Sequence, residues 1–248
     1  MKVIAASFLD NAALDSCMLF RGLTDGERAA LVARATTRRF ASGETIFLME
    51  SCGDSMMAVL SGRVRISVSS ADGKEFTLAI VQKGEVFGEI ALLDRKERTA
   101  DAIALTACKL AVLERREILS FFQDHPAVLL RIVDLLCMRL RQTDEHIVEL
   151  ALLPLSVRVA KVLLRMATDS WTANDRANRQ VRLSQRELGA IVGGSRESIN
   201  KCLRAWQKDG LVRIRKSLIT ILDREAFEQL AETGRPRRIQ RHARRAAR

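Results

Sequence analysis

The sequence has no apolar stretch approaching the ~18 residues that a membrane span requires, although 48% of its 248 residues are hydrophobic. Near its beginning, Asp10 and Asp15 follow a short apolar stretch, so the layout of a secretory signal is missing. We therefore expect a cytoplasmic protein with no membrane partner. The length suits two modest domains, each large enough to bury a core of its own.

The five cysteines form no Cys-x-x-Cys pair, which argues against a disulfide framework or a zinc knuckle. The three histidines lie far apart, and none has metal-ligand spacing with a cysteine or a carboxylate cluster. There is no P-loop, kinase or metallohydrolase signature, and Glu85 and Glu89 have no His or Cys close to them in sequence. The sequence therefore predicts no metal site, no cofactor and no enzymatic activity.

Positive charge is in excess, because 41 Lys and Arg residues against 30 Asp and Glu residues give a formal net charge of +11. An excess of this size indicates a polyanionic partner. Seven of the eleven net charges are arginines in residues 235–248, which contain no acidic residue. We expect a basic, disordered tail there. It is either a plain extension or an arm that adds nonspecific affinity for DNA.

Residues 40–113 alternate short apolar segments with turns. Strand-like patterning occurs at 45–48, 64–68 and 76–80, and glycines punctuate the region at intervals of about ten residues. This pattern predicts an all-β barrel or jelly roll. A helix over residues 25–36 is expected before it, because Thr24 and Glu27 form a capping-box pattern.

The run from Gly84 to Leu93, followed by Arg98-Thr99-Ala100, is the strongest functional signal in this region. Glycines leave amide N–H groups accessible, a hydroxyl adds a donor, and an arginine fork fits two phosphate oxygens. Glu89 supplies an acceptor for ribose hydroxyls. Glycines alone are common in turns between strands, but the whole arrangement predicts a pocket for a small phosphorylated ligand. We name the seven candidate residues of this pocket the cassette. They are Gly88, Glu89, Ile90, Ala91, Arg98, Thr99 and Ala100.

A heptad pattern follows, with steps of four and three between the residues that carry it. These residues are Leu129, Val133, Leu136, Leu140, Thr143, Ile147 and Leu150. Such a seam can pack a helix against its own domain, but its length and the following Pro154 favour a parallel homodimer. We expect the hinge of the molecule at Pro154.

Two further helices are indicated beyond residue 184. Ser184 and Glu187 form a capping box, Gly193-Gly194 ends the first helix, and Ser195 caps a second, amphipathic helix. Apolar segments at 211–215 and 218–222 then form a hairpin with basic residues near its turn. An αα-hairpin would share this spacing, but the polar face and the wing favour a helix-turn-helix that binds double-stranded DNA.

Two motifs, Gly88-Glu89…Arg98-Thr99-Ala100 and Gly194–Ser198, resemble those of the Crp/Fnr family of bacterial transcription regulators, and the likeness extends over residues 19–223. It implies an α+β chain with an N-terminal β-roll (jelly-roll) cyclic-nucleotide-binding domain at 1–125. A dimerisation helix and hinge at 126–154 and a winged helix-turn-helix at 155–234 then follow, with the basic tail at 235–248. The implied function is a homodimeric, cyclic-nucleotide-controlled transcription regulator that binds a pseudopalindromic DNA site, with RNA polymerase as an expected partner. Activation and repression both stay open.

The resemblance also implies which residues choose the base of the ligand. Thr143 and Asp144 match the two positions on the long helix that reach the purine. In the family a serine usually follows this threonine, whereas this sequence has Asp144. The Asp144 carboxylate can accept hydrogen bonds from the amino group of adenine or from the two donors of guanine. Thr99 after the cassette arginine is also similar to cyclic-GMP-binding domains. We expect cyclic AMP, with cyclic GMP as the alternative.

For DNA, the resemblance implies that Arg196 donates to guanine and Glu197 accepts from cytosine. Lys201 occupies a third reading position, where an arginine is usual. Residues in phosphate or flanking positions are Ser184, Gln185, Arg186, Ser195 and Ser198. Other family members sense haem or no ligand at all, and an iron–sulfur cluster would need more N-terminal cysteines than Cys17. A regulatory module of an enzyme is the remaining alternative.

Overall fold

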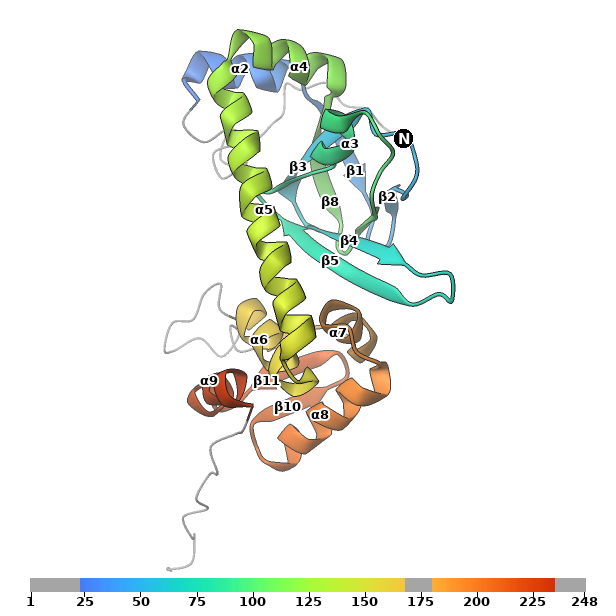
Figure 1. Ribbon diagram of the computed structural model, residues 1–248, viewed down its shortest axis with the longest axis vertical. Helices are drawn as coiled ribbons and strands as arrows, with labels where there is room; N and C mark the ends of the chain where they lie inside the picture. Colours follow the sequence, from blue (N-terminus) through green and yellow to red (C-terminus); the bar gives the residue numbers. More distant parts are fainter. Residues whose placement is uncertain (1–22, 168–179, 235–248) are drawn as a thin grey trace, which may run out of the picture. The chain divides into compact units, whose positions relative to one another are not determined.

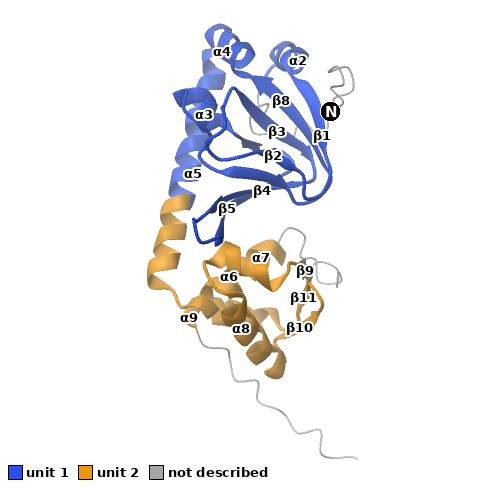
Figure 2. Cartoon of the chain, turned by 90° about the vertical axis from the view of Figure 1, so that its right-hand side faces the viewer, with its two compact units in different colours: residues 1–142 blue, residues 143–248 orange. Residues whose placement is uncertain are grey.

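The computed structural model describes residues 23–167 and 180–234, and the chain divides into two compact units, residues 1–142 and 143–248 (Figure 2). The dividing point lies inside the longest helix. The predicted basic tail, 235–248, lies outside the described residues, as does Cys17. The domain bounds given above remain a prediction.

Unit 1 contains two four-stranded antiparallel sheets, with strand orders β1-β8-β3-β6 and β2-β7-β4-β5 (Figure 1). The strands are β1 (Thr36–Phe40), β2 (Thr45–Phe47), β3 (Ser55–Ser61), β4 (Arg63–Ser69), β5 (Glu75–Gln82), β6 (Val86–Phe87), β7 (Asp101–Ala104) and β8 (Cys108–Glu114). The helices of this unit are α2 (Asp25–Arg34), α3 (Glu89–Asp94), α4 (Arg115–Asp124) and the first part of α5 (Pro126–Leu152). The predicted β-rich fold with a long helix is confirmed.

Strand β3 is buried on both faces, because its alternate residues enter two different cores. Met57 and Val59 belong to a cluster that the two sheets share. Met56, Ala58 and Leu60 belong to a second cluster, formed with residues of α2, α4 and α5. The first sheet is thus covered by the second sheet on one face and by helices on the other.

Helix α5 is 27 residues long and begins at Pro126, a position at which proline suits a helix. Its buried residues are Val128, Ile132 and Leu135, which pack against the core of unit 1. The predicted dimer seam stays a prediction, but one of its residues, Leu136, is half-buried and packs against this core. The reason is that the helix has two apolar faces, and a heptad pattern cannot tell which one meets its own domain. Apolar residues that remain exposed are Leu129, Leu130, Val133, Met138, Leu140, Ile147, Val148 and Leu152.

Unit 2 contains the end of α5 and a small mixed domain. Its other elements are α6 (Leu155–Ala167), β9 (Gln180–Arg182), α7 (Gln185–Val192), α8 (Arg196–Lys208), β10 (Val212–Arg215), β11 (Leu218–Ile221) and α9 (Arg224–Thr233). The three strands form an antiparallel sheet in the order β10-β11-β9. The predicted helix-turn-helix and wing are confirmed.

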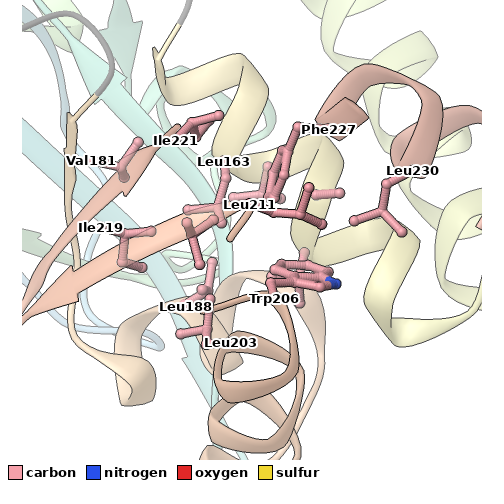
Figure 3. Packing of buried hydrophobic residues seen from close by; sticks show 14 of the residues in the cluster. Leu163, Val181, Leu188, Leu203, Trp206, Leu211, Ile219, Ile221, Phe227 and Leu230 are labelled. Atoms are coloured by element: carbon pink, nitrogen blue, oxygen red, sulfur yellow. The ribbon is translucent and has the colours of Figure 1, made fainter. Parts of the chain in front are cut away.

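One apolar cluster holds unit 2 together (Figure 3). Trp206 of α8 meets Phe227 of α9 edge to face, with ring centroids 5.1 Å apart, an arrangement that aromatic pairs prefer. Leu163 of α6, Leu188 of α7 and Ile219 of β11 join the same cluster. Helices and wing therefore share a single core, which fixes α8 relative to the rest of the unit.

Within residues 23–167 and 180–234, no helix combines the length and apolarity needed to cross a membrane. The same described ranges contain no group of three or more His, Cys, Asp or Glu residues that could hold a metal ion.

Candidate functional site

The cassette predicted from the glycines begins with a sharp turn into helix α3. Gly88 is the N-cap of this helix and has φ 80°, a left-handed conformation that favours glycine. A Cβ atom at this position would also lie 2.7 Å from Nη1 of Arg98. Conformation and space both require glycine here, and the consequence is that the arginine can pass close to the backbone.

Arg98 is the buried cation of the cassette, with 5% of the residue exposed. Its Nη1 donates to the Gly88 carbonyl and its Nη2 to the Ser55 carbonyl, each at 2.7 Å. The guanidinium carbon also lies 4.2 Å from the centroid of the Phe47 ring. Burial lowers the pKa of Arg98 from its ordinary value, and the charges of Asp54 and Glu89 oppose this shift. The Arg98 side chain is therefore fixed in position by two backbone carbonyls and by the ring of Phe47.

One donor of this arginine is left over. Among the described residues, Nε of Arg98 is buried and has no hydrogen-bond partner. A buried donor without a partner is costly, and an anion in the pocket would satisfy it.

Glu89 is almost completely buried, at 1% exposure, and forms an ion pair with Arg139 of α5. Arg139 also donates to the carbonyl oxygen of Val86. The prediction from sequence missed Arg139, although it lies four residues before Thr143 and hence on the same helical face. That spacing was the available signal. Glu89, predicted to accept from ribose, already has a partner on the long helix.

A cavity of about 60 Å³ joins these groups. All seven predicted cassette residues line it, together with Phe47, Ile66, Phe87 and Arg139. A larger cavity of about 310 Å³ is lined by 52–54, Ala91, 95–97 and Arg115. Arg98 does not line this larger cavity, whose lining combines cations with the carboxylates of Asp54 and Glu97. We therefore assign the ligand to the smaller cavity.

Thr143 and Asp144 do not line this cavity. Both are exposed on α5 and belong to unit 2, whereas the cassette belongs to unit 1. Their predicted role in reading the base stays a prediction.

The turn between α7 and α8 is tightly built from glycines. Gly193 has φ 64° and ends α7. A Cβ on Gly189 would lie 2.5 Å from the carbonyl oxygen of Gly194, so the two helices approach more closely than a larger residue allows. Ser195 then caps α8 by accepting from the backbone N–H of Ser198 at 3.1 Å.

Helix α8 turns one face to the core and the other to solvent. Ile199, Leu203 and Trp206 are buried. The predicted base readers Arg196, Glu197 and Lys201 are exposed. Arg204 and Lys208 are exposed too, and they continue the face of Glu197 and Lys201 at helical spacing. They were not among the residues predicted from sequence, although the helical spacing places them on this face.

The predicted phosphate contacts fall at helix starts. Ser184 accepts from the backbone of Glu187 at 3.2 Å and so caps α7. Gln185 donates to the side chain of Asn200 at 3.3 Å and links the two helices. Arg186 is exposed, whereas the hydroxyls of Ser195 and Ser198 bond each other at 2.9 Å. The hydroxyls of these serines are already used in helix capping and in the bond between them. A contact with DNA phosphate would use the hydrogen-bonding positions that remain on each hydroxyl.

The wing brings further basic residues to the surface of unit 2. Strands β10 and β11 pair from Val212 with Ile221 to Arg215 with Leu218. Lys216 stands in the turn with φ 53°, and Arg213 and Arg215 are exposed. Such a hairpin suits contact with a phosphate backbone.

Comparisons with known proteins agree with this geometry. A cyclic nucleotide-binding domain model matches residues 37–125, and a Crp-like helix-turn-helix domain model matches residues 157–230. The CRP-like cAMP-activated global transcriptional regulator of Mycobacterium tuberculosis is 30% identical over 214 residues, which are 86% of this chain and 96% of that protein. The cyclic AMP receptor protein of Thermus thermophilus is 30% identical over 213 residues, with the same coverage.

Solved structures show the same architecture. The c-di-GMP responsive global regulator CLP of Xanthomonas campestris has a TM-score of 0.73 and 26% identity, covering 81% of this chain and 100% of that one. The catabolite activator protein of Thermus thermophilus has a TM-score of 0.51 and 30% identity, covering 87% and 98%. With a cyclic nucleotide-binding domain and a Crp-like helix-turn-helix, the chain belongs to the Crp/Fnr family of DNA-binding transcription regulators.

Proposed function

We propose that this protein is a homodimeric transcription regulator whose affinity for a pseudopalindromic DNA site is controlled by a cyclic nucleotide. The observation that carries the proposal is the cavity in the matched cyclic nucleotide-binding domain, which the buried Arg98 lines and where its Nε has no hydrogen-bond partner among the described residues. A cyclic phosphate would satisfy this donor by a charge-assisted bond. The protein would act in the cytoplasm, where its DNA lies.

The pocket must rearrange to admit a nucleotide, because about 60 Å³ is too small for a base, a ribose and a phosphate together. Such a ligand needs a pocket of about 300 Å³ or more. We expect Arg98 and Arg139 to exchange their carbonyl partners at Gly88 and Val86 for oxygens of the ligand. Glu89 would then accept from the ribose.

Cyclic AMP is the ligand we propose first. The Mycobacterium tuberculosis relative is named as a cAMP-activated regulator, and the Thermus thermophilus relative is named as a cyclic AMP receptor protein. A guanine nucleotide is the second candidate, because the Asp144 carboxylate can accept both donors of guanine. The Xanthomonas regulator, described as responsive to c-di-GMP, supports keeping a guanine ligand in the test.

The proposed dimer uses the exposed apolar residues of α5. Leu140 and Ile147 are 62% and 57% exposed, and they lie one heptad apart on the helix. A second copy of α5 would cover them, as in a parallel two-stranded coiled coil. Two recognition helices α8 would then enter major grooves about 34 Å apart. We expect activation through RNA polymerase.

Calorimetric titration of the full chain with cyclic AMP, cyclic GMP and c-di-GMP tests the choice of ligand. We expect cyclic AMP to bind best and to be recovered unchanged, since no enzymatic step is proposed. If no cyclic nucleotide binds, the proposal is wrong, and an optical spectrum of the protein then tests the haem alternative. Hydrolysis of the nucleotide would favour an enzyme module instead.

A further inference from the structure

Glu149, one turn before the end of α5, is held by two cations of the next helix. Nζ of Lys161 lies 2.8 Å from one carboxylate oxygen, and Nη2 of Arg165 lies 3.3 Å from the other. The Glu149 side chain is only 16% exposed. Both partners lie on α6, beyond the bend at Pro154. We call this three-residue group the Glu149 clasp.

The cations of α6 need a carboxylate at this place. Arg158, Lys161 and Arg165 follow one another at helical spacing, so their charges share one face. Burial alone would raise the pKa of Glu149, but the hydrogen bond from Lys161 and the charge of Arg165 bring this pKa below its ordinary value. The carboxylate is therefore charged at neutral pH, and its loss would leave cations facing one another.

The same helix α6 contacts the helix-turn-helix. Nη1 of Arg158 donates to the carbonyl oxygen of Val192, at the end of α7, at 2.7 Å. A Cβ on Gly194 would lie 2.8 Å from Cδ1 of Leu155, so α6 touches the turn just before Ser195 caps α8. Helix α6 thus contacts Glu149 of α5 through Lys161 and Arg165, and it contacts the turn before α8 through Leu155.

An independent observation concerns the other side of Glu149. The compact units divide between residues 142 and 143, so the last part of α5 is grouped with the DNA-binding unit. Thr143 and Asp144 lie in that part, six and five residues before Glu149, on a continuous helix. Residues 143–152 therefore form one helical segment that Glu149 ties to α6.

We infer that Glu149 is a positioning residue for ligand control, because its clasp makes residues 143–152 and α6 move together, and α6 passes that movement to the turn before α8. The inference rests on the proposed function for the nature of the signal. The clasp itself does not depend on which ligand provides the signal. It adds to the hinge predicted at Pro154 a contact that crosses this hinge.

The test compares three variants of the full chain with the unaltered protein. Glu149→Gln removes the charge and keeps the shape. Glu145→Gln is the matched control, since Glu145 is an exposed glutamate on the same helix. Glu149→Lys combined with Lys161→Glu and Arg165→Glu reverses every charge of the clasp and should restore it. Hydrogen–deuterium exchange over residues 143–152 measures whether the clasp stabilises this segment. Operator affinity with and without cyclic AMP measures the coupling between ligand binding and DNA binding.

For Glu149→Gln we expect amide exchange over 143–152 to become about fivefold faster, the size of effect that a partly exposed ion pair supports. Exchange over 126–142 should stay unchanged. The ratio of operator affinities with and without cyclic AMP should fall by about fivefold, within the usual range of coupling. The control should resemble the unaltered protein, and the variant with all three clasp charges reversed should recover both measurements.

Unchanged exchange over 143–152 in Glu149→Gln would overturn the clasp. Faster exchange with an unchanged affinity ratio would overturn its role in coupling, and so would failure of the variant with all three clasp charges reversed to recover that ratio. If the unaltered protein responds to neither cyclic AMP nor cyclic GMP, the proposed function fails, while the exchange measurement still tests the clasp.

Discussion

The cassette of unit 1 and the recognition helix of unit 2 handle charge in opposite ways. Arg98 and Glu89 are 5% and 1% exposed, and each has partners within the protein. Arg196, Glu197 and Lys201 are exposed on α8. A buried charge left without its partner is expensive, whereas an exposed one stays hydrated. Substitutions in the cassette should therefore affect ligand binding and stability together, and substitutions on α8 should affect DNA binding alone.

The largest effect is expected for Arg98→Leu. Leucine cannot bind phosphate, and a charge-assisted hydrogen bond is worth ~1.5–3 kcal/mol, so cyclic-nucleotide binding should be lost. The carbonyls of Gly88 and Ser55 lose their donor, so the protein should be less stable, while the proposed dimer stays folded. Calorimetry measures the binding, and sedimentation measures the dimer. Arg116→Leu, at an exposed arginine of α4, is the matched control. Normal nucleotide affinity of Arg98→Leu would show that the phosphate binds elsewhere.

Arg139→Met should come next, because it leaves the Glu89 carboxylate buried without its cation. Removing one partner of a buried pair costs about 3 kcal/mol, and less here because Arg139 itself is 30% exposed. We expect lower stability of unit 1 in urea unfolding. Adding Glu89→Gln should recover part of the loss, since the uncompensated charge is then gone. No change in stability would mean that water, not Arg139, compensates Glu89.

Glu197→Ala should weaken discrimination at one base pair by ~1–3 kcal/mol and leave nonspecific DNA affinity almost unchanged. The measurement is binding to a series of operators with single base-pair changes. Glu232→Ala, at an exposed glutamate of α9, is the control. Equal discrimination by Glu197→Ala and the unaltered protein would refute the assignment of Glu197 as a base reader.

The smallest expected effect is a change in the stability of unit 2 with pH. Burial lowers the pKa of His146 from its ordinary value of 6.5, and the charges of Arg165 and Arg158 act in the same direction, whereas Glu149 opposes them. The unfolded chain therefore binds a proton at higher pH than the folded one, and this histidine's stabilising contribution is complete above pH 6.5 and declines as the pH falls below it. Urea unfolding between pH 7 and pH 5 measures the decline, which His146→Gln should reduce. An identical decline in the variant would assign it to other groups.

The sequence predicted well whatever depends on neighbours along the chain. The capping boxes of Thr24 and Ser184 were correctly predicted, because both partners lie within one helical turn. The cassette residues also come together as predicted, since glycine spacing and the strand pattern are local signals. Local patterns therefore gave most of the fold and most residues of the candidate ligand pocket.

The misses concern contacts between distant residues. Arg139 reaches Glu89 across fifty positions in the sequence, and no periodicity reports such a pair. Leu136 fits the heptad seam yet packs against its own domain, because the pattern shows an apolar face and not what covers it. Lys161 reaches Glu149 beyond Pro154, where the helical spacing rule no longer applies.

The central claim is that a cyclic nucleotide in the cassette controls DNA binding by α8. Fluorescence anisotropy of a labelled pseudopalindromic operator, titrated with the full chain at fixed salt, with and without saturating cyclic AMP or cyclic GMP, tests it most directly. We predict that one of the two nucleotides tightens operator binding by about 5–150-fold, the usual range for coupled sites. Equal operator affinity in the presence and absence of both nucleotides would contradict the claim.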